Sequence, residues 1–202
     1  FGSAISLGPE RILSWRVSSC EGRQCLQLVE LSTEVELQNA MLRIYFPEPI
    51  ISVKCFFEPD VYDLVIAVVT LTGVRIAWLK NCITLEGSTE AAVSRLINKT
   101  SNPLSAKTFE SKEGQQVLCC DARLVCNDLE IYLGTNAGLT LNLVVTDSGN
   151  VRVKHELKQN SSGFSLFRSP SKSSGLASRI CCVRAVGQSE ILLTLSEDGK
   201  LK

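Results

Sequence analysis

The side chains best suited to chemistry in this chain are nine cysteines and a single histidine, His155. A cysteine nucleophile needs a nearby base, usually a histidine, to take up its proton. His155 lies in residues 150–157, where polar and apolar side chains alternate as they do in a β-strand. A catalytic pair would require one of the cysteines to meet it in space. We therefore expect His155 to lie on a strand surface instead.

Metal binding is the second chemistry that cysteines could support. A structural zinc site needs four ligands, usually supplied by closely spaced cysteine or histidine pairs. The chain has no C-x-x-C motif, and Cys20 and Cys25 form the one close pair, across a predicted hairpin turn. Five others fall inside predicted strands: Cys55, Cys119, Cys120, Cys181 and Cys182. We expect buried, reduced thiols that act as small apolar side chains, as in cytosolic or nuclear proteins, with disulfides or a metal site as the alternatives.

The carboxylates and glycines show no catalytic signature. Acidic residues occur at the expected ends of strands, without the paired spacing of a glycosidase: Asp60, Asp63, Asp121, Asp128 and Glu130. The chain has no G-x-S-x-G nucleophile elbow and no glycine-rich phosphate loop. We therefore predict that the protein is not an enzyme and has no catalytic, metal-binding or cofactor-binding residues.

The composition of the chain argues against several classes of partner. Its 202 residues contain 21 Lys+Arg and 21 Asp+Glu, whereas a nucleic-acid surface needs a basic stripe. No apolar run reaches the roughly 18 residues of a membrane span, and no signal-peptide pattern is present at Phe1. The hydrophobic content of 45% is enough for a core. We expect no direct nucleic-acid binding, no transmembrane segment and no small-molecule substrate.

The elements that must position these side chains form a repeat. A unit of two strands, a turn and a third strand occurs three times, in residues 50–80, 116–146 and 179–202. The middle strands are apolar runs, which predicts burial on both faces. When the copies are aligned at Gly73, Gly138 and Gly199, cysteines fall near the same place in each. We expect these glycines to provide the positive φ of a tight hairpin turn.

A repeated sheet that cannot bury both of its faces alone predicts an array. Neighbouring copies must cover each other, as the blades of a β-propeller do. The predicted fold is therefore all-β, a single partial propeller domain of WD-like blades over residues 1–202, with residues 1–49 as first-blade strands. The alternative is a β-sandwich with three similar hairpins, because these units exceed the ~40–45 residues of a WD blade. The last copy ends inside its third strand, so we expect further blades in a longer protein.

Two segments interrupt the repeat. Residues 88–98 predict one short helix between blades, with Ser88 as its cap and Glu90 in its first turn. Residues 161–177 are rich in serine, glycine and lysine, which predicts a flexible surface loop.

The segment 11–46 resembles the N-terminal β-propeller of the large nucleoporin, of about one hundred and sixty kilodaltons, in the Y-shaped outer-ring complex of the nuclear pore. The resemblance rests on Ser14-Trp15-Arg16, on residues 26–32 and 42–46, and on residues 65–78 with Thr70-Leu71-Thr72-Gly73-Val74. The tail at residues 193–201 looks like a WD-type hairpin.

This resemblance implies a propeller joined to an α-helical solenoid, and a structural scaffold at the nuclear pore in the nuclear envelope. It further implies a role in pore assembly, nucleocytoplasmic transport and mRNA export, with other nucleoporins of the Y-shaped complex as partners. No catalytic residue is carried over. The alternative is a WD-like adaptor of another assembly, such as a vesicle coat or a ubiquitin-ligase receptor.

Overall fold

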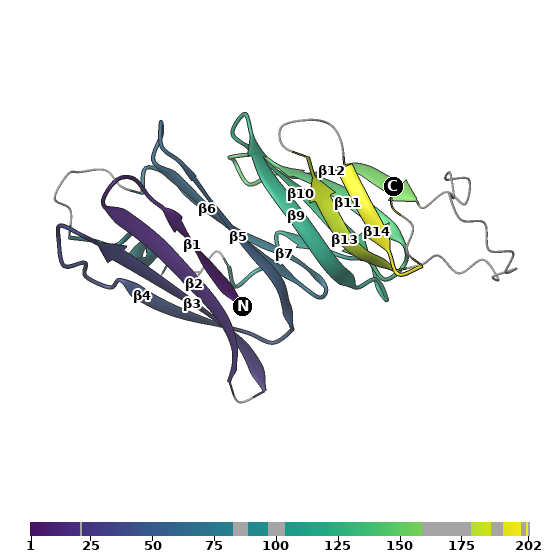
Figure 1. Ribbon diagram of the computed structural model, residues 1–202, viewed down its shortest axis with the longest axis horizontal. Helices are drawn as coiled ribbons and strands as arrows, with labels where there is room; N and C mark the ends of the chain where they lie inside the picture. Colours follow the sequence, from purple (N-terminus) through teal and green to yellow (C-terminus); the bar gives the residue numbers. More distant parts are fainter. Residues whose placement is uncertain are drawn as a thin grey trace, which may run out of the picture. The chain divides into compact units, whose positions relative to one another are not determined.

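The computed structural model describes residues 1–20, 22–82, 89–96, 104–158, 179–186, 192–198 and 201 (Figure 1). These residues form antiparallel β-sheets, which confirms the all-β prediction. The chain divides into two compact units, Phe1–Glu110 and Ser111–Lys202. The prediction that residues 1–202 make one partial propeller domain stays a prediction.

The first sheet of unit 1 is a four-stranded meander in the order β1-β2-β3-β4. Its strands are β1 (Gly2–Ser6), β2 (Arg11–Cys20), β3 (Arg23–Ser32) and β4 (Met41–Phe46). Successive side chains of a strand point to opposite faces. In β2, Leu13 and Trp15 therefore lie in the core while Ile12 is exposed. One face of this sheet is packed, and residues 1–49 supply a complete four-stranded unit.

The second sheet of unit 1 contains the first copy of the repeat, residues 50–80, and one further strand. Its order is β5-β6-β7-β8, with β5 (Ile50–Glu58), β6 (Asp63–Thr70), β7 (Gly73–Leu79) and β8 (Phe109–Glu110). Every residue of β6 after Asp63 is buried, which confirms the prediction of a middle strand covered on both faces. The two-residue β8 was not predicted, because residues 80–108 separate it from β7 in sequence.

The structure places a short helix within residues 88–98, as predicted. Its described part is a 3-10 helix, Ala92–Leu96, with four of its five side chains buried, whereas Ser88 lies outside the described residues. Glu90 precedes the helix and forms a parallel bridge with Gln38. Tertiary contacts explain the tighter turn, because the Val93 N–H donates to the buried Glu30 carboxylate (3.2 Å). Local helix propensity does not report such a partner.

Unit 2 contains the other two copies. One sheet has the order β12-β11-β10-β9, with β9 (Val117–Val125), β10 (Asp128–Thr135), β11 (Leu139–Val145) and β12 (Val151–Lys158). A second, two-stranded sheet pairs β13 (Ile180–Ala185) with β14 (Leu192–Ser196). Tyr132 of β10 packs with Ile180 and Val183 of β13. The strand β13 therefore covers β10, as the repeat argument requires.

The three aligned glycines do not play the same part. Gly138 has φ of 70°, as predicted for a hairpin turn. Gly73 does not have positive φ and is instead the first residue of β7, where a Cβ would clash with the Phe109 carbonyl oxygen. Glycine is needed there because β8 approaches closely, which corrects the predicted reason. Gly199 and the predicted loop at residues 161–177 lie outside the described residues.

The aligned cysteines are equivalent in two copies only. Cys119 and Cys182 each pair with the penultimate residue of the neighbouring middle strand. Cys55 instead pairs with Ile66, four residues before the end of β6. The sequence alignment placed Cys55 only near the cysteines of the other copies, and the strand pairing shows that its position is not equivalent to theirs.

Candidate interaction site

In the described part of the chain, His155 and the cysteines do not form a catalytic pair or a metal site. His155 is an exposed residue of β12, opposite Asn142, as predicted. The following cysteines are free thiols: Cys25, Cys55, Cys82, Cys119, Cys120, Cys126, Cys181 and Cys182. Burial raises the pKa of Cys82 and of Cys119 to about 12 and raises that of Cys55 further. The described residues contain no cluster of three or more His, Cys, Asp or Glu suited to a metal ion.

Burial of the cysteines is only partly as predicted. Three of them are buried: Cys25, Cys55 and Cys82. Cys181 and Cys182 are both exposed, contrary to the prediction for the third copy. The sheet β13-β14 has two strands in the described residues, so its side chains have fewer neighbours than those of the four-stranded sheets.

Two of the carboxylates expected at strand ends lie within strands. Asp121 belongs to the interior of β9 and Glu130 to that of β10, and both are buried. Glu130 is bound by Arg123 (2.7 Å), by the Tyr132 hydroxyl (2.6 Å) and by Lys154 (3.4 Å). Burial opposes its ionisation, but these partners outweigh burial and lower its pKa. Burial and the Glu130 hydrogen bond raise the pKa of Tyr132 to about 12.

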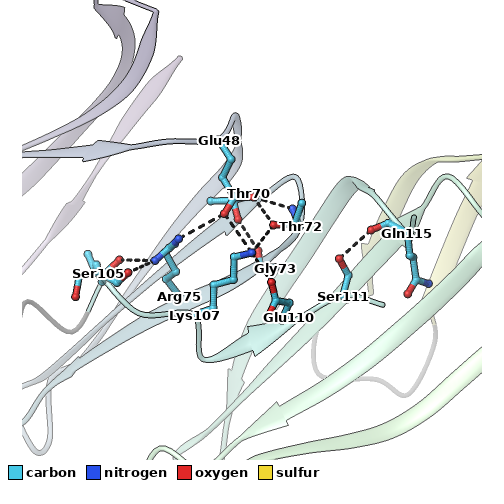
Figure 2. Close-up of polar contacts among 11 residues, drawn as sticks. Glu48, Thr70, Thr72, Gly73, Arg75, Ser105, Lys107, Glu110, Ser111 and Gln115 are labelled. Atoms are coloured by element: carbon cyan, nitrogen blue, oxygen red, sulfur yellow. Dashed lines mark hydrogen bonds and ion pairs between the residues drawn. The ribbon is translucent and has the colours of Figure 1, made fainter. Parts of the chain in front are cut away.

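A second polar cluster joins the turns of unit 1 (Figure 2). Glu48, between β4 and β5, accepts hydrogen bonds from the Thr72 N–H (3.1 Å) and from the Thr72 hydroxyl. Its carboxylate also meets Arg75 (3.4 Å) and Lys107 (3.8 Å). Burial raises the pKa of Glu48, but the threonine hydrogen bonds and the Lys107 charge outweigh it and lower the pKa overall. The cluster ties the start of β5 to the β6–β7 turn and to the segment before β8.

Arg75 is the buried cation of this cluster. Its side chain is 8% exposed, although arginine is rarely buried without partners. Nη1 donates to the carbonyl oxygen of Leu104 (3.4 Å). It also donates to the carbonyl oxygen of Ser105, which Figure 2 labels. The guanidinium carbon lies 5.6 Å from the centroid of the Phe46 ring. Its Nε is buried and has no hydrogen-bond partner among the described residues.

A hollow of about 350 Å³ lies beside Arg75 in unit 1. It is lined by Arg43, Ile44, Tyr45, Phe46, Pro47, Arg75, Leu104 and Ser105. Tyr45 is 52% exposed and Arg43 is exposed, so the entrance combines an aromatic ring with a cation. We regard this hollow as the candidate interaction site. Sequence reasoning missed it, although an arginine within the apolar strand Gly73–Leu79 was a signal.

Antiparallel sheets of four strands, whose second strand is buried after its first residue in the copies at residues 50–80 and 116–146, are the architecture of a β-propeller protein. Residues 11–202 match the model of the nucleoporin Nup120/160 β-propeller domain, so the chain belongs to this family. The family consists of nuclear pore complex components at the nuclear envelope, which confirms the resemblance and the predicted localisation. No curated protein matches the chain significantly. Among the described residues, no helix has both the length and the apolar character needed to cross a membrane.

Proposed function

We propose that the protein is a scaffold subunit of the outer ring of the nuclear pore, with other nucleoporins of the Y-shaped complex as its partners. In this role it supports pore assembly, nucleocytoplasmic transport and mRNA export. The family match over residues 11–202 is the observation that carries the proposal. The match belongs to a structural class of protein, so we propose no enzymatic activity, no small-molecule substrate and no direct nucleic-acid binding.

Features of unit 1 support a role in protein–protein contact. The uncovered face of the first sheet carries exposed apolar side chains, at Ile12, Leu31, Met41 and Tyr45. Exposed apolar groups gathered on one face are typical of surfaces that pack against other protein. Rigid sheets also present their edges to a partner without a large loss of conformational entropy on binding.

The proposal is tested by expressing the tagged protein in cells, locating it by fluorescence and identifying the proteins that co-purify with it. We expect staining of the nuclear rim and recovery of outer-ring nucleoporins. Depletion of the protein is expected to retain polyadenylated RNA in the nucleus. Diffuse cytoplasmic staining with vesicle-coat or ubiquitin-ligase subunits would instead support an adaptor of another assembly.

A matched pair of variants tests whether localisation of the tagged protein requires its folded sheets. Ile131→Asp places a charge in the interior of β10, where the side chain is fully buried, and should abolish rim staining. Val153→Asp places the same charge on the exposed side of β12 and should leave staining unchanged. Equal behaviour of the two variants would show that localisation does not depend on the folded sheets.

A further inference from the structure

We infer that the hollow beside β4 binds an extended, acidic segment of a partner protein, which adds along the edge of β4 and presents a carboxylate to Arg43 and Arg75. The inference rests on the proposed scaffold role and deepens it by naming the chemistry of one partner segment. Three independent observations support it: a strand edge, a buried donor and a local excess of positive charge.

The first observation is the edge of β4. Among the described residues β4 pairs with β3 alone, so its backbone groups on the other side are not used by a sheet. A strand with a free edge can pair with an extended peptide through main-chain hydrogen bonds. The hollow follows this strand from Arg43 to Pro47, so a peptide lying against the edge would also reach it.

The second observation is the Nε group of Arg75. The residue is 6% exposed, and Nε has no acceptor among the described residues. A buried donor without an acceptor destabilises a protein, and native structures rarely keep one without a reason. Both Nη atoms already have partners, in Leu104, Ser105 and Glu48, so Nε is the one nitrogen of this guanidinium without a partner among the described residues. A carboxylate or carbonyl oxygen entering the hollow would provide the missing acceptor.

The third observation is charge. The hollow is lined by two arginines and by no acidic residue. Arg43 is exposed and makes no ion pair with any described residue, whereas the nearby Glu48 is engaged by Thr72, Arg75 and Lys107. Arginine forms its strongest hydrogen bonds with carboxylates and phosphates. The exposed ring of Tyr45 adds an apolar contact for the neighbouring side chain of a peptide.

A protein segment fits these features better than a nucleic acid does. Binding to a phosphate backbone requires a series of cations, because each phosphate carries a charge. The hollow offers two, and the chain as a whole has no excess of positive charge. Hydrogen bonding along a strand edge is a property of polypeptides, and an alternating sequence would direct every second side chain toward the arginines.

The test measures binding of short fluorescent peptides to the purified protein by anisotropy. The probe alternates aspartate with leucine, and the controls alternate asparagine or lysine with leucine. We expect the aspartate peptide to bind most tightly and to weaken as salt is raised. Arg43→Glu should weaken it about tenfold, since removal and reversal of one interfacial charge commonly changes binding by that order. Arg152→Glu, the same change at an exposed position of β12, should have no effect.

A further variant tests the hollow separately from its charge. Ser105 is exposed at the rim, and Ser105→Trp should fill the space and abolish peptide binding without disturbing the core. Circular dichroism of each variant must match that of the unmodified protein. Equal binding of the aspartate and asparagine peptides, or no effect of either Arg43→Glu or Ser105→Trp, would overturn the inference. Displacement of the peptide by a short oligonucleotide of equal charge would reassign the site to phosphate and overturn it as well.

The two proposals fail separately. The inference fails if the unmodified protein does not bind the aspartate peptide. The scaffold role still stands in that case if the Arg43→Glu protein stains the nuclear rim and recovers outer-ring nucleoporins. If the peptide binds as expected but the protein is absent from the nuclear rim, the scaffold role fails, and the hollow is a binding site of a protein with another function.

Discussion

Thr70 and Thr135 hold the same position in two successive copies of the repeat. Each is the fully buried last residue of a middle strand, β6 or β10. The Thr70 hydroxyl donates to the carbonyl oxygen of Gly73 (3.1 Å), and that of Thr135 donates to the carbonyl oxygen of Leu139 (3.0 Å). Ser196 ends β14 in the third copy and is also buried. A hydroxyl therefore closes the hairpin after the middle strand in the first two copies, whereas the Ser196 hydroxyl donates to the Asp198 carboxylate (2.7 Å).

This position makes the first prediction. Thr135→Val keeps the shape of the side chain but removes the bond to the Leu139 carbonyl and the bond from the Leu139 N–H (3.1 Å). Buried groups left without partners should lower the free energy of unfolding by about 1–3 kcal/mol. Denaturant unfolding followed by circular dichroism measures the change. Thr135→Ser keeps the hydroxyl and should lose less, so equal losses in the two variants would contradict this role.

Gly134 makes the second prediction. A Cβ at this residue would lie 2.5 Å from Cys119 Sγ and 2.6 Å from a methyl carbon of Ile180. Gly134→Ala should therefore force β13 away from β10 and destabilise the protein by about 1–3 kcal/mol, as overpacking does. Thermal unfolding measures the loss. Adding Cys119→Ala removes the clashing sulfur and should restore part of the stability, whereas additive losses would show that the contact is not close.

The repeat was readable from the sequence because it rests on local patterns. The apolar run at residues 64–69 predicted a strand buried on both faces, and the structure places β6 there. The strands β8 and β12 were missed as members of the repeat because only pairing across the sheet defines them. The 3-10 form of the short helix could not be predicted, because Glu30, which accepts from the Val93 N–H, lies 63 residues away in sequence. The hollow at Arg75 was missed for the same reason, since its walls come from separate segments.

Arg11 and Glu30 make the third prediction. Their atoms Nη1 and Oε1 lie 3.1 Å apart in the interior of unit 1, and Glu30 is fully buried. Arg11→Met should leave the carboxylate without its cation and lower stability by about 3–5 kcal/mol at neutral pH. Arg16→Met, at an exposed position of the same strand, should change stability by less than about 0.5 kcal/mol. Similar losses in both variants, measured by urea unfolding, would count against the buried pair.

The same pair has a defined pH dependence. Burial raises the pKa of Glu30 although the Val93 N–H and Arg11 oppose this effect. A carboxyl whose pKa is raised on folding favours the folded state at low pH and loses this contribution as the pH rises through the folded pKa. The Arg11→Met defect should therefore shrink on acidification, because protonation removes the uncompensated charge. A defect that grows as the pH falls would be inconsistent with a buried carboxylate.

Glu130 makes the fourth prediction, with the opposite sign. Burial opposes its ionisation, but Tyr132 and Arg123 lower its pKa below the ordinary value of 4.5. A carboxyl whose pKa is lowered on folding stabilises the protein above the unfolded value, and this contribution is lost as the pH falls through the folded pKa. Glu130→Gln should be less stable than the unmodified protein at pH 7, and the difference should narrow below about pH 4.5. Unfolding midpoints measured across this range test it, and a difference independent of pH would exclude the ionised pair as its cause.

The last prediction concerns the reactivity of the thiols, which is lowered both by burial and by a raised pKa. An alkylating reagent reacts with the thiolate, so a thiol that is both covered and hard to ionise reacts slowly. Burial raises the pKa of Cys82 to about 12 and that of Cys55 further. Cys126, Cys181 and Cys182 are exposed. Brief treatment with iodoacetamide at about pH 7.5 should therefore modify the three exposed thiols first.

Peptide mass spectrometry after a time course gives the order of modification, and the same treatment in denaturant provides the control. Unfolding removes both burial and the pKa shift, so all the cysteines should then react at comparable rates. The ratio of native to denatured rates should be smallest for Cys55, the thiol with the largest shift. Rapid native modification of Cys55 would show that β5 is not packed in the core of unit 1, and the assignment of the second sheet would have to be revised.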